Sequence, residues 1–458
     1  MNRAPLAVAG LILLLAASPS RGDDWPMLGG RPDRNLVCAE KGLPVAFEAE
    51  KQQKNVKWAV NLGKTTYGTP AVAGGRVFVG TNNEQPRDPA LKGDKGVLMC
   101  FAEADGKFLW QAVHAKLETG ELEDAAFIGL CSTPCIAGDR LYYVSNRAEL
   151  ICCSAQDGKP VWTLDFRKEL GVSPHQGSAS SPLVVGDLVY VVTGHGSDFK
   201  KHKVLNPKAP SFVAVNRSTG KLVWQDSSPG DRIFAGQWGS PSYGVVEGKA
   251  QVAFPGGDGW LYAFEPETGK LLWKFNCKAH EKLDKDGFPE TPNQLVATPV
   301  YAGHRVIIAT GIDTDTNGPG CLRAIDARKS GDVTRTAELW KLAGEEFACS
   351  ISTVAVHEGL VYAVQFPGMF DCIDLETGKR IWQHDMLSTA FGSPLVADGK
   401  AYVRNGDGEV LVFQTGREKK LLAKNAGLPG VENGSVVAAN GVLFVAGRNK
   451  LYALAETK

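Results

Sequence analysis

Oxygen-bearing side chains alternate between residues 313 and 318, a pattern suited to metal binding. Asp313, Asp315 and Asn317 are followed by Gly318. Alternate Asp and Asn side chains can converge on a calcium ion, and glycine permits the sharp turn that such a loop makes. The twelfth position, which holds a bidentate Glu in helix-loop-helix sites, is Ala324. Asp, Asn and Gly are also common turn residues, so a plain polar turn is the alternative to a calcium site.

Two further polar sets could hold a ligand. The first is suited to a cation or a sugar-like molecule and consists of Asn82, Asn83, Glu84, Arg87 and Asp88. The second combines histidines with a carboxylate and an amide: His175, Gln176, His195, Asp198 and His202. The spacing of this second set matches no established metal signature. For both sets the alternative is an ordinary polar loop whose side chains bond to their own backbone.

Signatures of common enzymes are absent from the sequence. It contains no nucleophile elbow, no phosphate-binding Gly-x4-Gly-Lys-Ser/Thr loop, no His-Glu-x-x-His and no Cys-x-x-Cys-His haem motif. Lys plus Arg and Asp plus Glu each total 50. A chain without excess positive charge is not expected to bind nucleic acid. The sequence therefore favours a binding protein over an enzyme.

Seven tryptophans mark a repeat that must position these polar sets. They stand 42 to 67 residues apart, and five of them close a phrase of Asp or Thr, then Gly, Lys, two further residues and Trp. The seven are Trp58, Trp110, Trp162, Trp224, Trp273, Trp340 and Trp382. A period near 50 residues is typical of stacked units or of a propeller.

Each unit of the repeat reads as four short strands. It opens on small residues and usually a proline, and then alternates stretches rich in Val, Tyr, Phe and Leu with glycine-containing turns. The openings stand at Pro70, Pro134, Pro182, Pro241, Pro299 and Pro394, with proline-free versions near Thr353 and Ser435. Short apolar strands between glycine turns are typical of antiparallel blades. We therefore expect an all-β, eight-bladed β-propeller with four antiparallel strands per blade.

The two ends of the chain are predicted to close this ring. The last unit, from Ser435 to Leu454, supplies only three strands, whereas Val56 to Leu62 precedes the first complete unit. Pairing of this N-terminal strand with the C-terminal blade would leave no open seam. We expect residues 56–458 to form one propeller domain, preceded by an N-terminal extension at residues 23–55.

Residues 1–22 have the features of a secretory signal. Arg3 precedes an apolar run from Leu6 to Ala17, and small residues follow through Gly22. The run is too short to span a bilayer. No cysteine directly follows it, so a lipid anchor is not expected. We expect cleavage between Ser18 and Gly22, and a soluble monomer exported to the periplasm or the cell exterior.

Three of the ten cysteines fall at one repeat position. This position is occupied in different units by Cys100, Cys152, Cys372, Ala214 and Ala263. A small, tightly packed strand position accounts for them, so buried thiols are expected there. Cys152 and Cys153 are adjacent, but consecutive side chains of a strand point to opposite faces, which opposes a bond between them.

The phrases from Phe264 to Trp273 and from Ile373 to Trp382 resemble the repeat of the PQQ-like propeller family. The resemblance covers about nine tenths of the chain after the signal, and it implies that the repeat tryptophans are structural residues between blades. The family includes quinoprotein alcohol and sugar dehydrogenases, and also cofactor-free propellers of outer-membrane assembly. No calcium-binding Glu, Asn and Asp set of the dehydrogenases can be assigned position by position.

Long connections crowd one face of the predicted ring. First and third turns are short, except around residues 327–338, whereas second turns and blade-to-blade links carry the insertions. Binding residues concentrate in long loops on rigid scaffolds. We therefore expect a binding or protein-assembly scaffold that engages a protein partner or a small ligand on this face. The alternative is a PQQ- and calcium-dependent dehydrogenase of alcohols or sugars, with its cofactor over the central axis on the same face.

Overall fold

The computed structural model describes residues 22–50, 53–118, 125–176, 180–198, 203–278, 294–311, 319–428 and 434–456. The predicted secretory signal, apart from Gly22, lies outside the described residues. Strands dominate these ranges, joined by one short helix, α1 (Phe166–Leu170), and one 3-10 turn, η1 (Gly230–Arg232). No helix within them is long and apolar enough to cross a bilayer.

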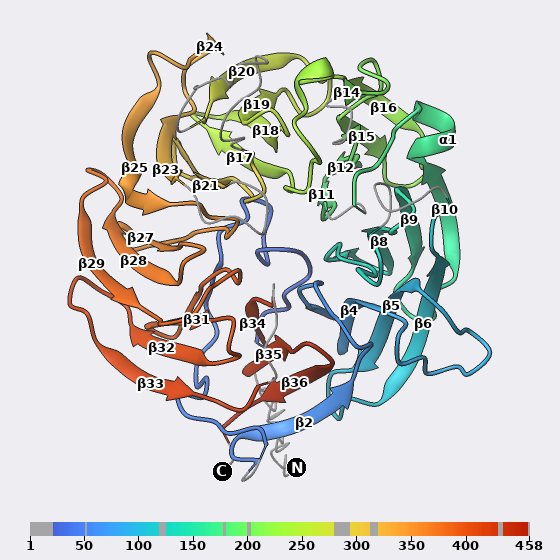
Figure 1. The fold of residues 1–458 in the computed structure, drawn as a ribbon, viewed down its shortest axis with the longest axis vertical. Helices are drawn as coiled ribbons and strands as arrows, with labels where there is room; N and C mark the ends of the chain where they lie inside the picture. Colours follow the sequence, from blue (N-terminus) through green and yellow to red (C-terminus); the bar gives the residue numbers. More distant parts are fainter. Residues whose placement is uncertain are drawn as a thin grey trace, which may run out of the picture.

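Antiparallel sheets stand around a central axis as blades (Figure 1). The first blade contains β3 (Ala71–Ala73), β4 (Arg76–Asn82), β5 (Lys95–Ala102) and β6 (Phe108–Ala115). The second contains β7 (Cys135–Ala137), β8 (Arg140–Val144), β9 (Glu149–Ser154) and β10 (Pro160–Asp165). The third contains β11 (Leu183–Val185), β12 (Leu188–Val192), β15 (Phe212–Asn216) and β16 (Leu222–Asp226). The fourth contains β17 (Ser242–Val246), β18 (Lys249–Pro255), β19 (Trp260–Phe264) and β20 (Leu271–Asn276).

The remaining blades complete the ring. The fifth contains β21 (Val300–Ala302), β22 (Arg305–Thr310), β23 (Pro319–Asp326) and β25 (Glu338–Ala348). The sixth contains β26 (Ala355–His357), β27 (Leu360–Val364), β28 (Met369–Asp374) and β29 (Arg380–Asp385). The seventh contains β30 (Leu395–Ala397), β31 (Lys400–Arg404), β32 (Val410–Gln414) and β33 (Leu421–Asn425). The eighth contains β34 (Val436–Ala439), β35 (Val442–Ala446), β36 (Lys450–Leu454) and β2 (Val56–Asn61), so the predicted eight-bladed β-propeller is confirmed.

The ring is closed by the N-terminal strand β2. It pairs antiparallel with β36, from Val56 opposite Leu454 to Asn61 opposite Lys450. The indole N–H of Trp58 on β2 donates to the Glu103 carbonyl of the first blade at 2.9 Å. The predicted closure by pairing of the two chain ends is therefore confirmed.

The position of a strand in its blade decides which side chains it buries. All five residues of β27 are buried, because neighbouring blades cover both of its faces. The outermost strand β16 buries only Trp224. Continuous apolar runs near the axis and isolated tryptophans at the rim follow from this arrangement.

Trp162 of the second blade shows how neighbouring blades are joined. Its indole N–H donates to the Arg217 carbonyl of the third blade at 2.9 Å, and Gly220 of the same turn covers the ring. A Cβ atom on Gly220 would lie 2.8 Å from indole Cδ2, and the φ of Gly220 is +72°, so glycine fits for two reasons. The same contact recurs for Gly106 with Trp58, Gly158 with Trp110, Gly269 with Trp224 and Gly378 with Trp340.

The junction of the fourth and fifth blades departs from this pattern. The fifth blade has no Gly-Lys turn; instead β24 (Gly331–Asp332) pairs in parallel with β20, with Gly331 opposite Trp273. The indole N–H of Trp273 donates to the side-chain oxygen of Gln251 at 2.8 Å. The irregular third turn around residues 327–338 thus extends the neighbouring sheet.

The cysteines are buried or partly buried free thiols. Cys152 lies opposite Trp162 in the second blade, as Ala214 lies opposite Trp224 in the third. Cys152 and Cys153 follow one another within β9 and are not bonded. Burial raises the pKa of the Cys153 thiol to about 12, which keeps it protonated and unreactive near neutral pH.

Residues 22–47 form an N-terminal strap along the innermost strands. Backbone N–H groups donate to the strap around the ring, and the donors are Val72, Ile136, Tyr243, Tyr301, Val356 and Val396. Within the strap, β1 (Val37–Cys38) pairs in parallel with β30. The buried guanidinium of Arg34 donates to the carbonyls of Leu28, Ser181, Pro182 and Pro241. The strap is therefore an integral part of the ring.

Candidate functional site

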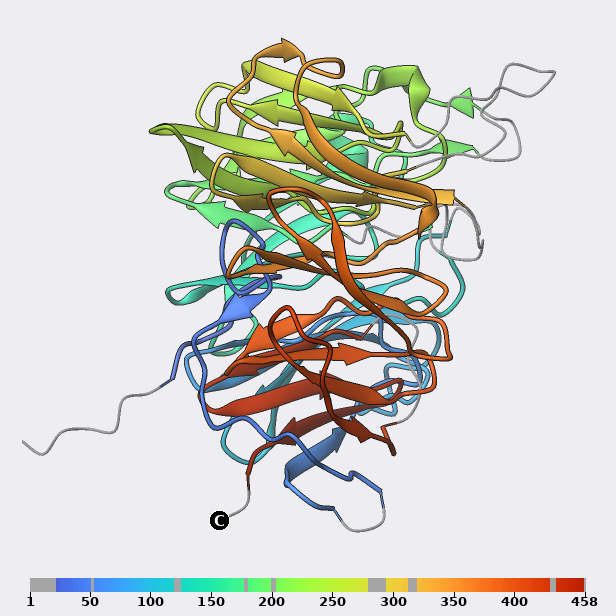
Figure 2. The ribbon, with the colours of Figure 1, turned by 90° about the vertical axis from the view of Figure 1, so that its left-hand side faces the viewer.

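The two ends of the ring differ because the strap occupies one of them. Asp24 accepts a hydrogen bond from Gly74 at 3.1 Å, and Asp398 accepts one from Gly42 at 2.9 Å. Gly74 and Asp398 lie in the first turns of their blades, so the strap covers the first-turn end (Figure 2). Second connections and blade-to-blade links emerge at the opposite end, which we term the long-loop face.

Asn82 of the first predicted polar set ends β4 at the long-loop face and is fully buried. Its side-chain oxygen accepts from the N–H of Lys64 at 2.9 Å. Its Nδ2 donates to the carbonyl of Phe127 at 2.8 Å and to the carboxylate of Glu84 at 3.1 Å. The Lys64 ammonium pairs with Glu84 at 3.1 Å. Asn82 therefore links three connections of the first blade.

This network presents the side chain of Phe127 to solvent. The Phe127 N–H donates to Asp94 at 2.8 Å, and the Lys116 ammonium pairs with the same carboxylate oxygen at 3.0 Å. Phe127 has a φ of 57° and is 45% exposed. A bulky residue in the left-handed region costs about 1–3 kcal/mol and persists only where its surroundings hold it. Asn82 and Asp94 thus hold the backbone from which the exposed aromatic ring of Phe127 projects.

Asn83 and Asp88 of the first set bond within their own loop, whereas Arg87 contacts neighbouring strands. The Asn83 amide donates to the carbonyl of Leu91, and Asp88 accepts the N–H of Ala90 at 2.9 Å. The Arg87 guanidinium lies over the ring of Phe108, 4.7 Å from its centroid. Asn83 and Asp88 thus bond as expected of a polar loop, and Arg87 connects this loop to β6.

His195 of the second set joins two connections through its imidazole. Its Nδ1 accepts from the N–H of Ser173 at 3.0 Å, and its Nε2 donates to the carbonyl of Asn206 at 2.9 Å. Burial lowers the pKa of His195, which favours the neutral ring. Both ring nitrogens are engaged by backbone atoms.

The remaining described residues of the second set lie close to His195 along the chain segments that pair there, but they form no metal-binding group. His175 bonds to the Ser197 carbonyl at 3.0 Å through Nδ1 and packs edge-on against Trp238, 5.8 Å between ring centroids. Asp198 lies in β13 (Ser197–Asp198), which pairs with β14 (Lys203–Val204). His202 lies outside the described residues. Hydrogen bonds thus connect the described loops of the third blade.

A polar cluster that the sequence did not predict lies in the second connection of the fourth blade. The Tyr262 hydroxyl donates to the buried carboxylate of Asp258 at 2.7 Å, and the half-exposed Arg232 guanidinium lies 3.3 Å from it. Burial raises the pKa of Asp258 although Tyr262 and Arg232 oppose this. Asp258-Gly259 reads as a plain hairpin turn in the sequence, because Arg232 comes from a separate link.

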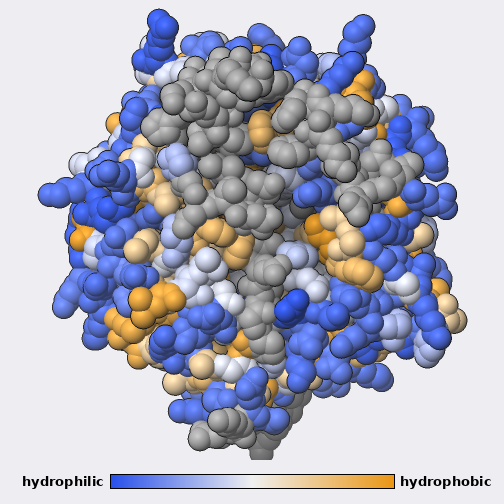
Figure 3. All heavy atoms as spheres, in the orientation of Figure 1, coloured by the Kyte–Doolittle hydropathy of each residue, from blue (hydrophilic) through white to orange (hydrophobic). Residues whose placement is uncertain are grey.

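Apolar side chains are also displayed at the long-loop face. Of the eleven large apolar side chains exposed in the described residues, seven lie on the outermost strands of blades and Val245 lies on β17. The remaining three lie in long-loop-face connections: Phe127, Leu205 and Leu387. Figure 3, which views this face, shows apolar patches separated by hydrophilic side chains.

Leu387 is the most exposed of these three side chains. It is 81% exposed and has a φ of 58°. Its N–H donates to the Asp385 carboxylate at 2.8 Å, and the neighbouring Met386 carbonyl accepts from the Asn405 amide at 3.3 Å. As at Phe127, an Asn at the end of an inner strand and an Asp hold a strained, exposed apolar residue in place.

The described residues do not fit a quinone site of the kind that the resemblance implies. Several quinoprotein dehydrogenases have a disulfide between two adjacent cysteines, which forms a ring over the quinone. Cys152 and Cys153 are instead free thiols, buried inside a blade within β9. Among described residues, no three His, Cys, Asp or Glu side chains group closely enough to hold a metal ion. Asp313, Asp315 and Asn317 lie outside the described residues, so calcium binding there stays a prediction.

Comparison with protein families gives a match over most of the ring. The profile of the family described as outer membrane protein assembly factor BamB matches residues 94–331 and 320–457. The BamB of Yersinia pestis is 23% identical over 363 residues, which cover 78% of this chain and 80% of that protein.

Quinone-dependent enzymes match a smaller part of the chain. The 1-butanol dehydrogenase (cytochrome c) of Thauera butanivorans is 31% identical over 161 residues. These residues cover 32% of this chain but only 20% of the dehydrogenase. Among solved structures, BamB from Moraxella catarrhalis superposes with a TM-score of 0.57 at 14% identity, over 87% of this chain and 97% of that one. This structural likeness concerns the fold.

Proposed function

The chain belongs to the family described as outer membrane protein assembly factor BamB, and from that premise we propose that it is an exported scaffold that binds a protein partner. The partner that we expect is a component of outer-membrane protein assembly, the process named by the relatives that cover most of the chain. Residues 1–22 would be the export signal, residues 23–55 the N-terminal extension and residues 56–458 the propeller. The proposed location is the periplasm.

The observation that carries the proposal is the presentation of Phe127 and Leu387 at the long-loop face. Both are exposed and held at positive φ by neighbouring Asn and Asp side chains. Exposed apolar patches rimmed by polar residues, such as those that Figure 3 shows on this face, mark protein interaction sites. A loop backbone that is held before binding loses little conformational freedom on binding. The opposite end of the ring is already occupied by the strap.

Serine substitutions test this proposal. We expect Phe127→Ser and Leu387→Ser each to weaken binding to the purified outer-membrane assembly complex about tenfold or more, because an apolar anchor is lost. The matched control is Val245→Ser, which removes an exposed apolar side chain from β17, next to a first turn. Binding measured by surface plasmon resonance should be unchanged in the control. Equal affinities for all variants would contradict the proposal.

A quinone-dependent dehydrogenase is the second candidate, and the partial match to 1-butanol dehydrogenase favours it. It predicts alcohol or sugar oxidation with an artificial electron acceptor after PQQ and calcium are added. Binding at 100 times the dissociation constant would also stabilise the protein by about 2.7 kcal/mol. A panel of alcohols and aldoses without turnover, together with an unchanged Tm, would remove this candidate.

A further inference from the structure

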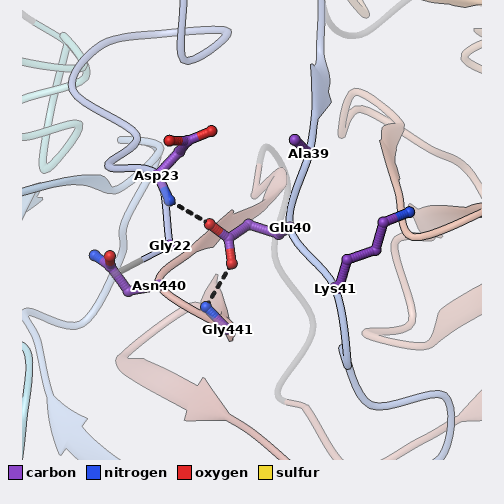
Figure 4. A pocket seen from close by; sticks show the side chains of 7 residues that line it. All are labelled: Gly22, Asp23, Ala39, Glu40, Lys41, Asn440 and Gly441. Carbon is purple, nitrogen blue, oxygen red and sulfur yellow. Dashed lines mark hydrogen bonds between the residues drawn. The ribbon is translucent and has the colours of Figure 1, made fainter. Parts of the chain in front are cut away.

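A buried carboxylate stands where the strap meets the eighth blade. Glu40 is 6% exposed. Its Oε1 accepts the backbone N–H of Asp23 at 2.6 Å, and its Oε2 accepts that of Gly441 at 2.6 Å (Figure 4). In the part of the chain that the structure describes, both partners are neutral amides. Burial of an ionised carboxylate is costly unless a cation neutralises it.

The neighbouring lysine does not supply that cation. Figure 4 shows the Lys41 side chain pointing away from Glu40, and its ammonium lies 3.8 Å from Asp398 instead. A pocket of about 400 Å³ adjoins the carboxylate and is lined by Gly22, Asp23, Ala39, Glu40, Lys41, Asn440 and Gly441. The site therefore has a buried carboxylate without a cationic partner among the described residues, and a pocket beside it.

Neighbouring atoms leave no room for a side chain at Gly22. A Cβ atom on Gly22 would lie 2.5 Å from Oε1 of Glu40 and 2.7 Å from Cα of Asn440. By contrast, Asp24 makes specific contacts, to Gly74 of the first blade at 3.1 Å and to Asn440 of the eighth at 3.2 Å. Among the described residues, the hydrogen bonds between strap and blades thus begin at Asp23.

The sequence around the Gly22–Asp23 bond suits a signal peptidase. Ser20 and Gly22 are small residues at the third and first positions before it, as such enzymes require. Hydrolysis there would add water across the bond, leaving a carboxylate on Gly22 and an amine on Asp23. The amine takes up a proton near neutral pH and becomes an ammonium group.

We propose that export cleaves the chain between Gly22 and Asp23, and that Glu40 captures the new α-ammonium group of Asp23. The inference rests on the proposed export of the protein. The same nitrogen that now donates as an amide would then donate as a cation, which makes a stronger hydrogen bond to the carboxylate. Capture of a chain terminus by a preformed site is a known recognition mode. The pair would fasten the strap at the junction of the first and eighth blades.

Two measurements on the full chain, recovered after export, test the proposal. Intact mass and N-terminal sequencing should show a chain that begins at Asp23; a chain that begins elsewhere overturns the proposal. Reductive methylation of the α-amine at pH 7 should be about tenfold slower in the folded protein than in urea. Each tenfold change corresponds to about 1.4 kcal/mol that favours the ammonium form.

Glu40→Gln separates charge capture from simple shielding of the terminus. We expect this isosteric variant to raise the labelling rate of the folded protein to within about twofold of the unfolded rate. Asp398→Asn is the matched control, because Asp398 also accepts strap N–H groups, from Gly42 and Leu43, but lies next to Lys41. It should label as slowly as the unaltered protein. Slow labelling of Glu40→Gln, or fast labelling of the unaltered protein, would overturn the proposal.

The labelling test of the Asp23 amine does not depend on whether the protein binds the proposed partner. The labelled amine lies at the first-turn end, whereas Phe127 and Leu387 lie at the long-loop face. Loss of partner binding would leave the labelling result intact, and a terminus other than Asp23 would leave partner binding intact.

Discussion

His114 links the stability of this fold to pH. Its Nε2 lies 2.9 Å from the hydroxyl of Tyr143. Burial, with added repulsion from Arg147, lowers its pKa from 6.5 to about 4. The unfolded chain therefore takes up a proton near pH 6.5 that the folded chain takes up only near pH 4. Because of His114, the free energy of unfolding falls as the pH drops from about 6.5 to about 4, by up to about 1.4 kcal/mol per pH unit. Above pH 6.5 His114 contributes no pH dependence.

We expect His114→Gln to reduce this loss of stability. The variant cannot take up the proton, so its free energy of unfolding should decline less steeply between pH 6.5 and 4 than that of the unaltered protein. Urea titrations at pH 7.5, 6 and 5 would measure the difference. Above pH 6.5 the two dependences should run in parallel. Parallel dependences throughout the window would show that His114 does not carry the effect.

The polar loop residues illustrate what a sequence can predict about single side chains. Asn82 ends β4 of the first blade and His195 follows β12 of the third, yet the roles of both side chains depend on partners from other segments: Phe127 for Asn82 and Ser173 for His195. A sequence shows which side chains can donate or accept, but not whether distant backbone atoms already occupy them. For the same reason Asp258 looked like a plain turn residue. Its partner Arg232 lies 26 residues earlier.

At the scale of elements, each Gly-Lys turn joins its blade to the tryptophan of the preceding blade. Gly220 combines a φ of +72° with close contact to Trp162 of the preceding blade. Gly186, in the first turn of the same blade, has a φ of +57° and no atom within 4 Å of its would-be Cβ. Both glycines therefore have a positive φ, but only Gly220 lies against a tryptophan ring.

We expect Gly220→Ala to destabilise the protein more than Gly186→Ala. Both variants incur the left-handed cost of alanine, about 1–2 kcal/mol. Gly220→Ala adds overpacking against the indole, about 1–3 kcal/mol more. Free energies of unfolding from urea titrations would measure the gap. Equal losses of stability would mean that the Trp162 ring can shift without cost. The hydrogen bond to the Arg217 carbonyl would then be the contact that joins the two blades.

The blades were predictable from the sequence, whereas the strap was not. The repeated phrase ending in tryptophan fixes strand number and turn position, because each copy meets the same packing environment in the ring. Residues 22–47 have no period and few strand signals. Their position depends on backbone hydrogen bonds to inner strands that side chains do not encode, as between Trp25 and Val72. The sequence shows that the third turn of the fifth blade is irregular, but it does not show that β24 in this turn pairs with β20.

At the scale of the whole molecule, the two ends of the ring differ: the strap covers the first-turn end, and long connections form the other. Pairing of β2 with β36 closes the ring, and the strap contacts inner strands from the first blade to the eighth at the first-turn end. At the long-loop face, hydrogen bonds from Asn82 and Asn405 hold the connections that carry the exposed Phe127 and Leu387. This asymmetry makes the long-loop face the proposed partner-binding surface.

Site-specific photocrosslinking in living cells tests this central claim most directly. A photoreactive phenylalanine analogue would replace Phe127, Leu387 or, as the first-turn-end control, Val245. The account predicts adducts with an outer-membrane assembly protein from positions 127 and 387 and none from position 245. Adducts from position 245 alone, or none from positions 127 and 387 when the altered proteins are folded and exported, would contradict it.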